Sequence, residues 1–166
     1  IGLYLDVAVS VDRAGSDVWG HQHVFAPAAS IGAPPDEFNP LGQGWGLPPL
    51  HPQRLRESGY GLLVDTLRTS MRNAGAIRID HVMGFLRLYW IPEGLDARCG
   101  AYVHYRLDEI LAIVALESQR ASCLVIGEDL GTVTDETRAA LSARGVLSYR
   151  LLWFERDGAD FRQAAD

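Results

Sequence analysis

Two short stretches of the chain carry residues that could perform acid–base or nucleophilic chemistry. Residues 76–81 read AIRIDH, and residues 123–129 read CLVIGED. In each, an apolar run typical of a buried parallel strand ends in charged residues. Ligand sites of parallel α/β folds lie at the carboxyl ends of the strands, so we expect Asp80 and Glu128 at one edge of a sheet. Because Arg78 lies two residues before Asp80, it is on the same side of its strand. The pattern predicts a site with two carboxyls and one guanidinium.

Two carboxyls at one site can cleave a glycosidic bond with retention when they lie about 5–5.5 Å apart. One attacks the sugar carbon as a carboxylate, while the other protonates the departing oxygen and later deprotonates the acceptor. The neighbouring Arg78 would hold Asp80 ionised, whereas Glu128 would need a drier or more acidic surrounding to stay protonated near neutral pH. His81 could donate a hydrogen bond to a sugar hydroxyl.

A long stretch between the first strand and the first long helix could form the wall of such a site. Residues 16–52 show no sustained period of either kind and are rich in Gly and Pro. Structureless loops of this length are usually functional when they occur inside a compact domain. Within the stretch, Trp45 offers a flat apolar face suited to the C–H face of a pyranose, and Gln43 offers amide hydrogen bonds.

The elements that must position these residues alternate along the chain. Helices are predicted over residues 55–74, with Gly75 as a C-cap, over 105–119, and from Thr134 to just before Gly145. Strands are predicted over residues 1–9, 76–80, 123–127 and 149–154, and a short helix or turn over 82–91. This order predicts a parallel sheet with right-handed crossovers. The fold class is therefore α/β with about four parallel strands, roughly half of an eight-stranded barrel.

Composition sets limits on the partners. The chain has 166 residues, a net charge of −6 and 48% hydrophobic residues, so it is an ordinary globular sequence with no basic patch for nucleic acid or an anionic membrane. No apolar run of 18 residues occurs, and Cys99 and Cys123 show no metal spacing. We expect a cytoplasmic protein with reduced thiols and no nucleic-acid or membrane partner.

Several motifs together are typical of one family. They occupy residues 42–49 (GQGWGLPP), 78–83 (RIDHVM), 90–92 (WIP), 100–105 (GAYVHY) and 125–133 (VIGEDLGTV). In combination the chain resembles bacterial amylomaltase, the 4-α-glucanotransferase of maltodextrin metabolism. That resemblance implies a (β/α)8 TIM barrel with inserted subdomains. Residues 1–166 would be the central part of the barrel, with a loop insertion over about 16–52.

The resemblance also implies roles for individual residues. Asp80 would be the nucleophile that forms a glycosyl-enzyme, and Glu128 the general acid/base. Apart from the resemblance, Asp129 is expected to be a structural or loop-ordering residue. The partner would be a maltodextrin or another α-1,4-glucan, transferred to the 4-hydroxyl of a second glucan, with no cofactor. Substrate-binding roles are implied for Arg78, His81, Asp6, Asp36, Gln43 and Trp45.

One departure from the family pattern bears on completeness. The family has a third catalytic carboxylate in a Thr-His-Asp segment after a later strand, and residues 1–166 contain no such segment. We therefore expect a piece of a longer enzyme, inactive alone, that self-associates through open sheet edges.

Two other function classes remain open from the residues alone. A metal-dependent barrel hydrolase would use His21 and His23 together with Asp80 and Glu128, and it predicts bound zinc or a similar ion. A non-catalytic glucan-binding module would keep its aromatic and amide groups but would not need both acidic motifs, which are intact here.

Overall fold

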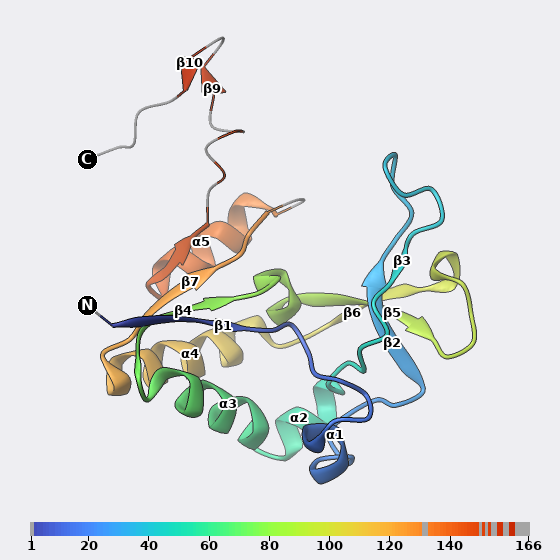
Figure 1. Ribbon diagram of the computed structural model, residues 1–166, viewed down its shortest axis with the longest axis horizontal. Coiled ribbons are helices and arrows are strands. Elements are labelled where there is room, and N and C mark those ends of the chain that lie inside the picture. The colour runs from blue at the N-terminus through green and yellow to red at the C-terminus, as the bar shows by residue number, and fades with distance from the viewer. Residues whose placement is uncertain are drawn as a thin grey trace.

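The computed structural model describes residues 2–130, 133–149, 151, 153, 156, 157, 160 and 161 (Figure 1). None of the helices in this part of the chain is long and apolar enough to cross a membrane. Two short 3-10 helices, η1 (Val82–Phe85) and η2 (Ala97–Cys99), accompany the α-helices and β-strands. These are β1 (Leu3–Val7), α1 (Ser16–Gly20), β2 (Ala29–Ala33), β3 (Gln43–Gly44), α2 (Pro52–Glu57), α3 (Gly61–Met71), β4 (Ala74–Ile79), β5 (Arg87–Pro92), β6 (Ala101–His104), α4 (Leu107–Ala121), β7 (Leu124–Gly127), α5 (Asp135–Ala143), β8 (Val146–Ser148), β9 (Arg156–Asp157) and β10 (Asp160–Phe161).

The predicted parallel sheet is confirmed. Its strand order is β1-β4-β7-β8, and all three pairings are parallel. A helix precedes each of the last three strands, so the chain crosses over after β1, β4 and β7, as parallel pairing requires. Figure 1 shows α3 and α4 side by side beneath this sheet, with the second sheet beyond its end.

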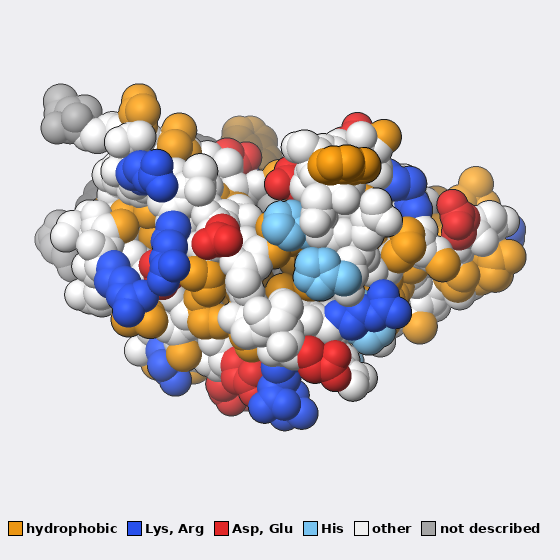
Figure 2. Space-filling model, turned by 90° about the horizontal axis from the view of Figure 1, so that it is seen from below, with side chains coloured by type: hydrophobic (Ala, Val, Ile, Leu, Met, Phe, Trp, Pro, Cys, Tyr) orange, Lys and Arg blue, Asp and Glu red, His pale blue; other side chains and the backbone are white. Residues whose placement is uncertain are grey.

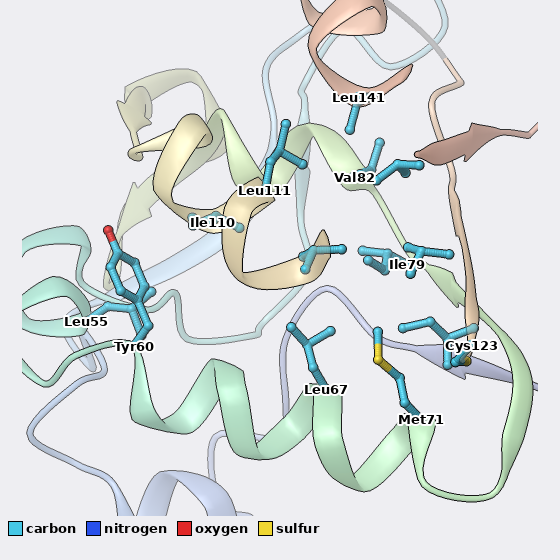
Figure 3. Close-up of a cluster of buried hydrophobic side chains, with 14 residues drawn as sticks. Leu55, Tyr60, Leu67, Met71, Ile79, Val82, Ile110, Leu111, Cys123 and Leu141 are labelled. Carbon is cyan, nitrogen blue, oxygen red and sulfur yellow. The ribbon is translucent and has the colours of Figure 1, made fainter. Parts of the chain in front are cut away.

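The core lies between the parallel sheet and its helices. Apolar residues recur at helical spacing, at Leu67 and Met71 on α3 and at Ile110, Leu111 and Val114 on α4, and all five are buried. They pack against the inward side chains of β4 and β7 (Figure 3). Burial of each such side chain contributes about 1.5–3 kcal/mol, which fixes the helices on this face.

A second, antiparallel sheet corrects two of the sequence predictions. Its order is β3-β2-β5-β6, and Ile31 of β2 pairs with Trp90 of β5. Residues 16–52 are therefore not structureless, because they contain α1, β2 and β3. Residues 82–91 do begin with a short helix, η1, but from Arg87 onward they form β5. The apolar run that favoured a helix or turn is instead a strand buried between β2 and β6.

The helix predicted over residues 55–74 is two helices. Gly59 and Tyr60 both have left-handed backbone angles, with φ of 65° and 59°, so a right-handed helix cannot continue through them. Gly75 is not a C-cap either, since α3 ends at Met71 and Gly75 lies within β4. A Cβ atom on Gly75 would lie 3.3 Å from the Cα of Gly2, which precedes β1, so the close approach of this backbone favours a residue without a side chain.

The last predicted parallel strand is displaced along the chain. The structure has β8 at Val146–Ser148, whereas the sequence pattern favoured 149–154. Tyr149 and Leu151 are not in a strand, and residues 150, 152 and 154 lie outside the described part of the chain.

Candidate active site

The carboxyl ends of the parallel strands bring the predicted acidic residues to one edge. Asp80 follows β4 and Glu128 follows β7, and the last residues of these strands, Ile79 and Gly127, are register partners. Asp6, on β1, is the register partner of Arg78. Three neighbouring strands thus deliver their charged residues to the same edge.

Arg78 is the centre of the charged cluster. Its neighbours Ile77 and Ile79 are buried in the core, so the alternation of the strand places Arg78 on the opposite face of the sheet. One guanidinium nitrogen donates to Asp6 at 2.7 Å, and the other donates to Asp80 at 2.8 Å. The hydrogen bond with Asp6, together with that to Asp80, raises the pKa of Arg78 further above its usual value. The carboxylate of Asp80 is therefore held by a permanent cation.

Glu128 is held by backbone groups instead. Its Oε2 accepts from the N–H of His81 at 3.0 Å, and its Oε1 accepts from the N–H of Leu130 at 2.8 Å. Its own N–H donates to Ile79 at 2.9 Å, and its carbonyl accepts from Val82 at 3.0 Å. Four hydrogen bonds thus fix this residue, three of them to the end of β4 and the turn that follows.

The backbone of His81 makes two of these bonds possible. His81 has φ 47° and ψ 60°, in the left-handed region, which turns the chain sharply after Asp80. Non-glycine residues rarely adopt this conformation, and they cluster at functional sites when they do. The turn aims the N–H groups of His81 and Val82 at Glu128. Burial lowers the pKa of His81, although the carboxylates of Glu128 and Asp80 oppose that effect.

The two carboxyls therefore have different electrostatic surroundings. Asp80 forms an ion pair with Arg78, whereas Glu128 accepts hydrogen bonds from neutral N–H groups. Among the residues that the structure describes, none places a cationic side chain within ion-pair distance of Glu128. Asp80 thus has a fixed cationic partner, whereas the partners of Glu128 are uncharged.

Trp45 and Gln43 lie next to this edge. The ring of Trp45 meets the ring of His81 edge-on, with centroids 5.6 Å apart and an interplanar angle of 88°. Its Nε1 donates to the side-chain oxygen of Gln43 at 3.3 Å. Strand β3 and the loop after it thus bring an aromatic face beside the β4 end.

Asp36 is not brought to this cluster. Its carboxylate accepts from the backbone N–H groups of Phe38 and Asn39, within the loop that joins β2 to β3. Figure 1 shows that this loop projects away from the parallel sheet.

The histidine pair of the metal alternative follows α1, and His21 lines the same cavity as Asp80. The rings of His21 and His23 lie 6.3 Å apart in the turn after α1. Within the ranges 2–130 and 133–149 and the few residues described beyond them, no three His, Cys, Asp or Glu side chains are grouped so that they could hold a metal ion. The arrangement of the side chains thus gives the metal-dependent alternative no support.

A cavity of about 420 Å³ adjoins the cluster, with Asp80 and His81 in its wall. Its other walls include Leu63 and Leu67 of α3 and Phe85 of η1.

Figure 2 shows the face beneath the parallel sheet, where acidic and basic side chains are interspersed with histidines and hydrophobic groups rather than gathered into one basic patch.

Comparison with known proteins decides the family. Residues 1–166 match a family model described as 4-alpha-glucanotransferase. The chain belongs to this family. The 4-alpha-glucanotransferase of Haemophilus influenzae is 48% identical over 166 residues, which are 100% of this chain and 24% of that protein. The chain thus spans about a quarter of the length of the curated relatives it matches.

Solved structures of amylomaltases share the fold. The crystal structure of amylomaltase from Corynebacterium glutamicum has a TM-score of 0.90 and 42% identity, covering 95% of this chain and 22% of that one. Amylomaltase from Streptococcus agalactiae in complex with acarbose has a TM-score of 0.83 at 22% identity, covering 93% of this chain and 32% of that one, and shows the fold alone. The four parallel strands are therefore part of a (β/α)8 barrel, as predicted.

The sequence pattern did not identify Ser148 and Tyr149 as neighbours of the charged cluster. The Arg78 guanidinium lies over the Tyr149 ring, 5.6 Å from its centroid. Both Ser148 and Tyr149 contact Asp129, a buried carboxylate. Asp80 was found because it is a polar residue at the end of a predicted parallel strand. The same criterion would have found Ser148 and Tyr149 if the last strand had been predicted at Val146–Ser148.

Proposed function

We propose that this chain carries two catalytic carboxyls of a retaining 4-α-glucanotransferase, Asp80 as nucleophile and Glu128 as general acid/base. The observation that carries the proposal is the difference between their surroundings. Asp80 is fixed by the Arg78 guanidinium, whereas the carboxylate of Glu128 accepts hydrogen bonds from the backbone N–H groups of His81 and Leu130. Membership of the 4-alpha-glucanotransferase family supports the substrate class.

In the first half of the reaction, Asp80 forms a covalent intermediate. A carboxylate oxygen of Asp80 attacks the anomeric carbon of an α-1,4-glucan, and the bond from that carbon to the glycosidic oxygen breaks. Glu128 gives its proton to the departing 4-oxygen. The glycosyl unit is then an ester of Asp80, and Glu128 is ionised.

In the second half, Glu128 takes the proton from the 4-hydroxyl of an acceptor glucan. The acceptor oxygen attacks the same anomeric carbon and displaces the Asp80 carboxylate, so the configuration is retained. Both carboxyls return to their initial protonation states.

The remaining residues of the cluster bind and orient the substrate. Arg78, held by Asp6 on its other side, keeps the Asp80 carboxylate in one direction. Trp45, whose ring lies beside that of His81, offers an aromatic surface to a sugar, and Gln43 offers an amide next to it. Asp36, whose contacts stay within its loop, would reach a sugar only at the outer end of a bound glucan.

The test is product analysis of the protein encoded by the complete gene after incubation with maltotriose. Glucose together with a ladder of longer maltodextrins is the expected result. Glucose and maltose without longer products would mean a hydrolase and would overturn the transfer step. The Asp80→Asn variant should lose at least about a thousandfold in kcat while still binding maltodextrin, because only the nucleophile is removed. Asp108→Asn, an exposed carboxyl in the first turn of α4, should retain full activity.

A further inference from the structure

Asp129 follows the proposed acid/base in sequence but faces away from solvent. Its side chain is only 2% exposed, and its oxygens contact three groups from other elements. Oδ2 accepts from the Ser148 hydroxyl at 2.7 Å and forms an ion pair with Arg138 of α5. Oδ1 accepts from the backbone N–H of Tyr149 at 3.1 Å.

These contacts extend the pairing of β7 and β8 beyond the ends of both strands. Gly127 and Ser148 are the last register partners of the two strands. The N–H of Tyr149 also donates to the carbonyl of Gly127 at 3.2 Å, so Asp129 and Gly127 share one donor. A buried carboxylate with three partners is a rigid junction, because each partner satisfies part of its charge.

The contacts of Asp129 connect it to both proposed catalytic residues, Glu128 and Asp80. On one side, Asp129 is covalently next to Glu128. On the other, it holds the backbone of Tyr149, whose ring lies against the guanidinium of Arg78. Arg78 in turn holds Asp80.

We propose that Asp129 is a positioning residue for the transfer reaction, fixing Glu128 directly and Asp80 through Tyr149 and Arg78. This inference rests on the proposed function. It predicts that loss of the Asp129 charge misplaces the catalytic carboxyls relative to each other without removing any group that touches the glucan.

The chain offers a matched control for the substitution. Glu117 on α4 is also a buried carboxylate, 4% exposed, paired with Arg68 and Arg120. It lies in the helical layer outside the sheet, and both of its ion-pair partners are on the helices α3 and α4. If buried ion pairs merely stabilise the fold, Asp129→Asn and Glu117→Gln should behave alike.

The experiment compares kcat and KM for maltotriose transfer in both variants of the full-length protein. Asp129→Asn should lower kcat about 10- to 100-fold with KM changed less than about threefold, because small misplacements at a reacting centre cost rate of this order. Glu117→Gln should lower the melting temperature while kcat and KM stay at wild-type values. Equal kcat values for wild type and Asp129→Asn would overturn the positioning role.

A double-variant cycle tests the route through Tyr149. If Asp129 acts partly through that ring, Tyr149→Ala should cost less in kcat when Asp129→Asn is already present than it does alone. Fully multiplicative effects would overturn this route.

The wild-type protein is assayed first, so that absence of transfer activity in wild type counts against the proposed function alone. In that case amide hydrogen exchange at Tyr149, faster in Asp129→Asn but unchanged in Glu117→Gln, still decides whether Asp129 holds the junction.

Discussion

The backbone N–H of His81 donates a 3.0 Å hydrogen bond to Oε2 of Glu128. The turn after β4, which follows Asp80, therefore also holds the carboxyl of Glu128 at the end of β7. The bond depends on a left-handed residue in the turn, because only that conformation directs the N–H across to β7. The relative placement of the two carboxyls is thus set by backbone geometry at one position, as well as by side-chain pairing.

Substitution at His81 should separate the backbone role from the side-chain role. His81→Gly keeps the left-handed turn without steric cost, whereas His81→Val must hold a β-branched residue at positive φ. We expect His81→Val to be less stable than His81→Gly by about 1–2 kcal/mol, the cost of the left-handed conformation. Urea unfolding of both variants measures this difference. Equal stabilities would show that the turn imposes no strain.

A side chain at Gly127 is predicted to destabilise the fold. A Cβ atom there would lie 3.0 to 3.1 Å from three carbons of Val82, a buried residue. Gly127→Ala should therefore destabilise the fold by about 1–3 kcal/mol through overpacking. It should also lower transfer activity, because Glu128 follows directly.

Gly20→Ala is the matched control, since a Cβ there meets no atom within 4 Å. Thermal unfolding of Gly127→Ala, Val82→Ala and the double variant should show non-additive effects, because the added methyl then occupies the space that Val82 leaves. Additive losses would contradict the contact.

The Glu117 cluster predicts a pH dependence of stability. The hydrogen bond from Arg68, opposed by desolvation and aided by Arg120, lowers the pKa of Glu117 below its ordinary value. A carboxyl with a lower pKa in the folded state contributes stability above its unfolded pKa of about 4.3, and this contribution disappears as the pH falls below it. The free energy of unfolding of wild type minus that of Glu117→Gln should thus be largest near neutral pH and shrink below about pH 4.5. A difference that does not change with pH would refute the assignment.

The face of the parallel sheet opposite the helices predicts association of the 166-residue chain when it is prepared by itself. Tyr4, Leu124 and Leu147 are 55%, 60% and 50% exposed, and the register places them on the face opposite the core. Parallel sheets are normally covered on both faces, so this surface favours contact with another copy. Sedimentation velocity should show oligomers that Leu124→Glu weakens. A monodisperse monomer with a sharp cooperative melt would disprove the prediction.

The parallel half of the fold could be predicted because local patterns determine it. Short aliphatic runs that end in charged residues predicted β4 and β7, and the helical spacing of Ile110, Leu111 and Val114 predicted α4. Strand polarity then placed Asp80 and Glu128 at one edge without any knowledge of the contacts.

The antiparallel sheet could not be predicted because its pairing is non-local. Strand β2 (ASIGA) is short and made of small residues, and its partner β5 lies more than fifty residues later. The break at Tyr60 was missed because the apolar period continues across it. The role of His81 in holding Glu128 depends on a backbone angle, and the contacts of Asp129 depend on the true position of β8, so neither could be read from spacing.

The most direct test of the account is to trap the covalent intermediate in the Glu128→Gln variant of the full-length protein. An α-maltosyl fluoride donor has a leaving group that needs no acid, so the first step proceeds while the second, which lacks its base, is slow. Peptide mass spectrometry should then find one maltosyl group as an ester on Asp80. A maltosyl group on another residue, or release of fluoride with inverted product and no adduct, would contradict the assignment of Asp80 and Glu128.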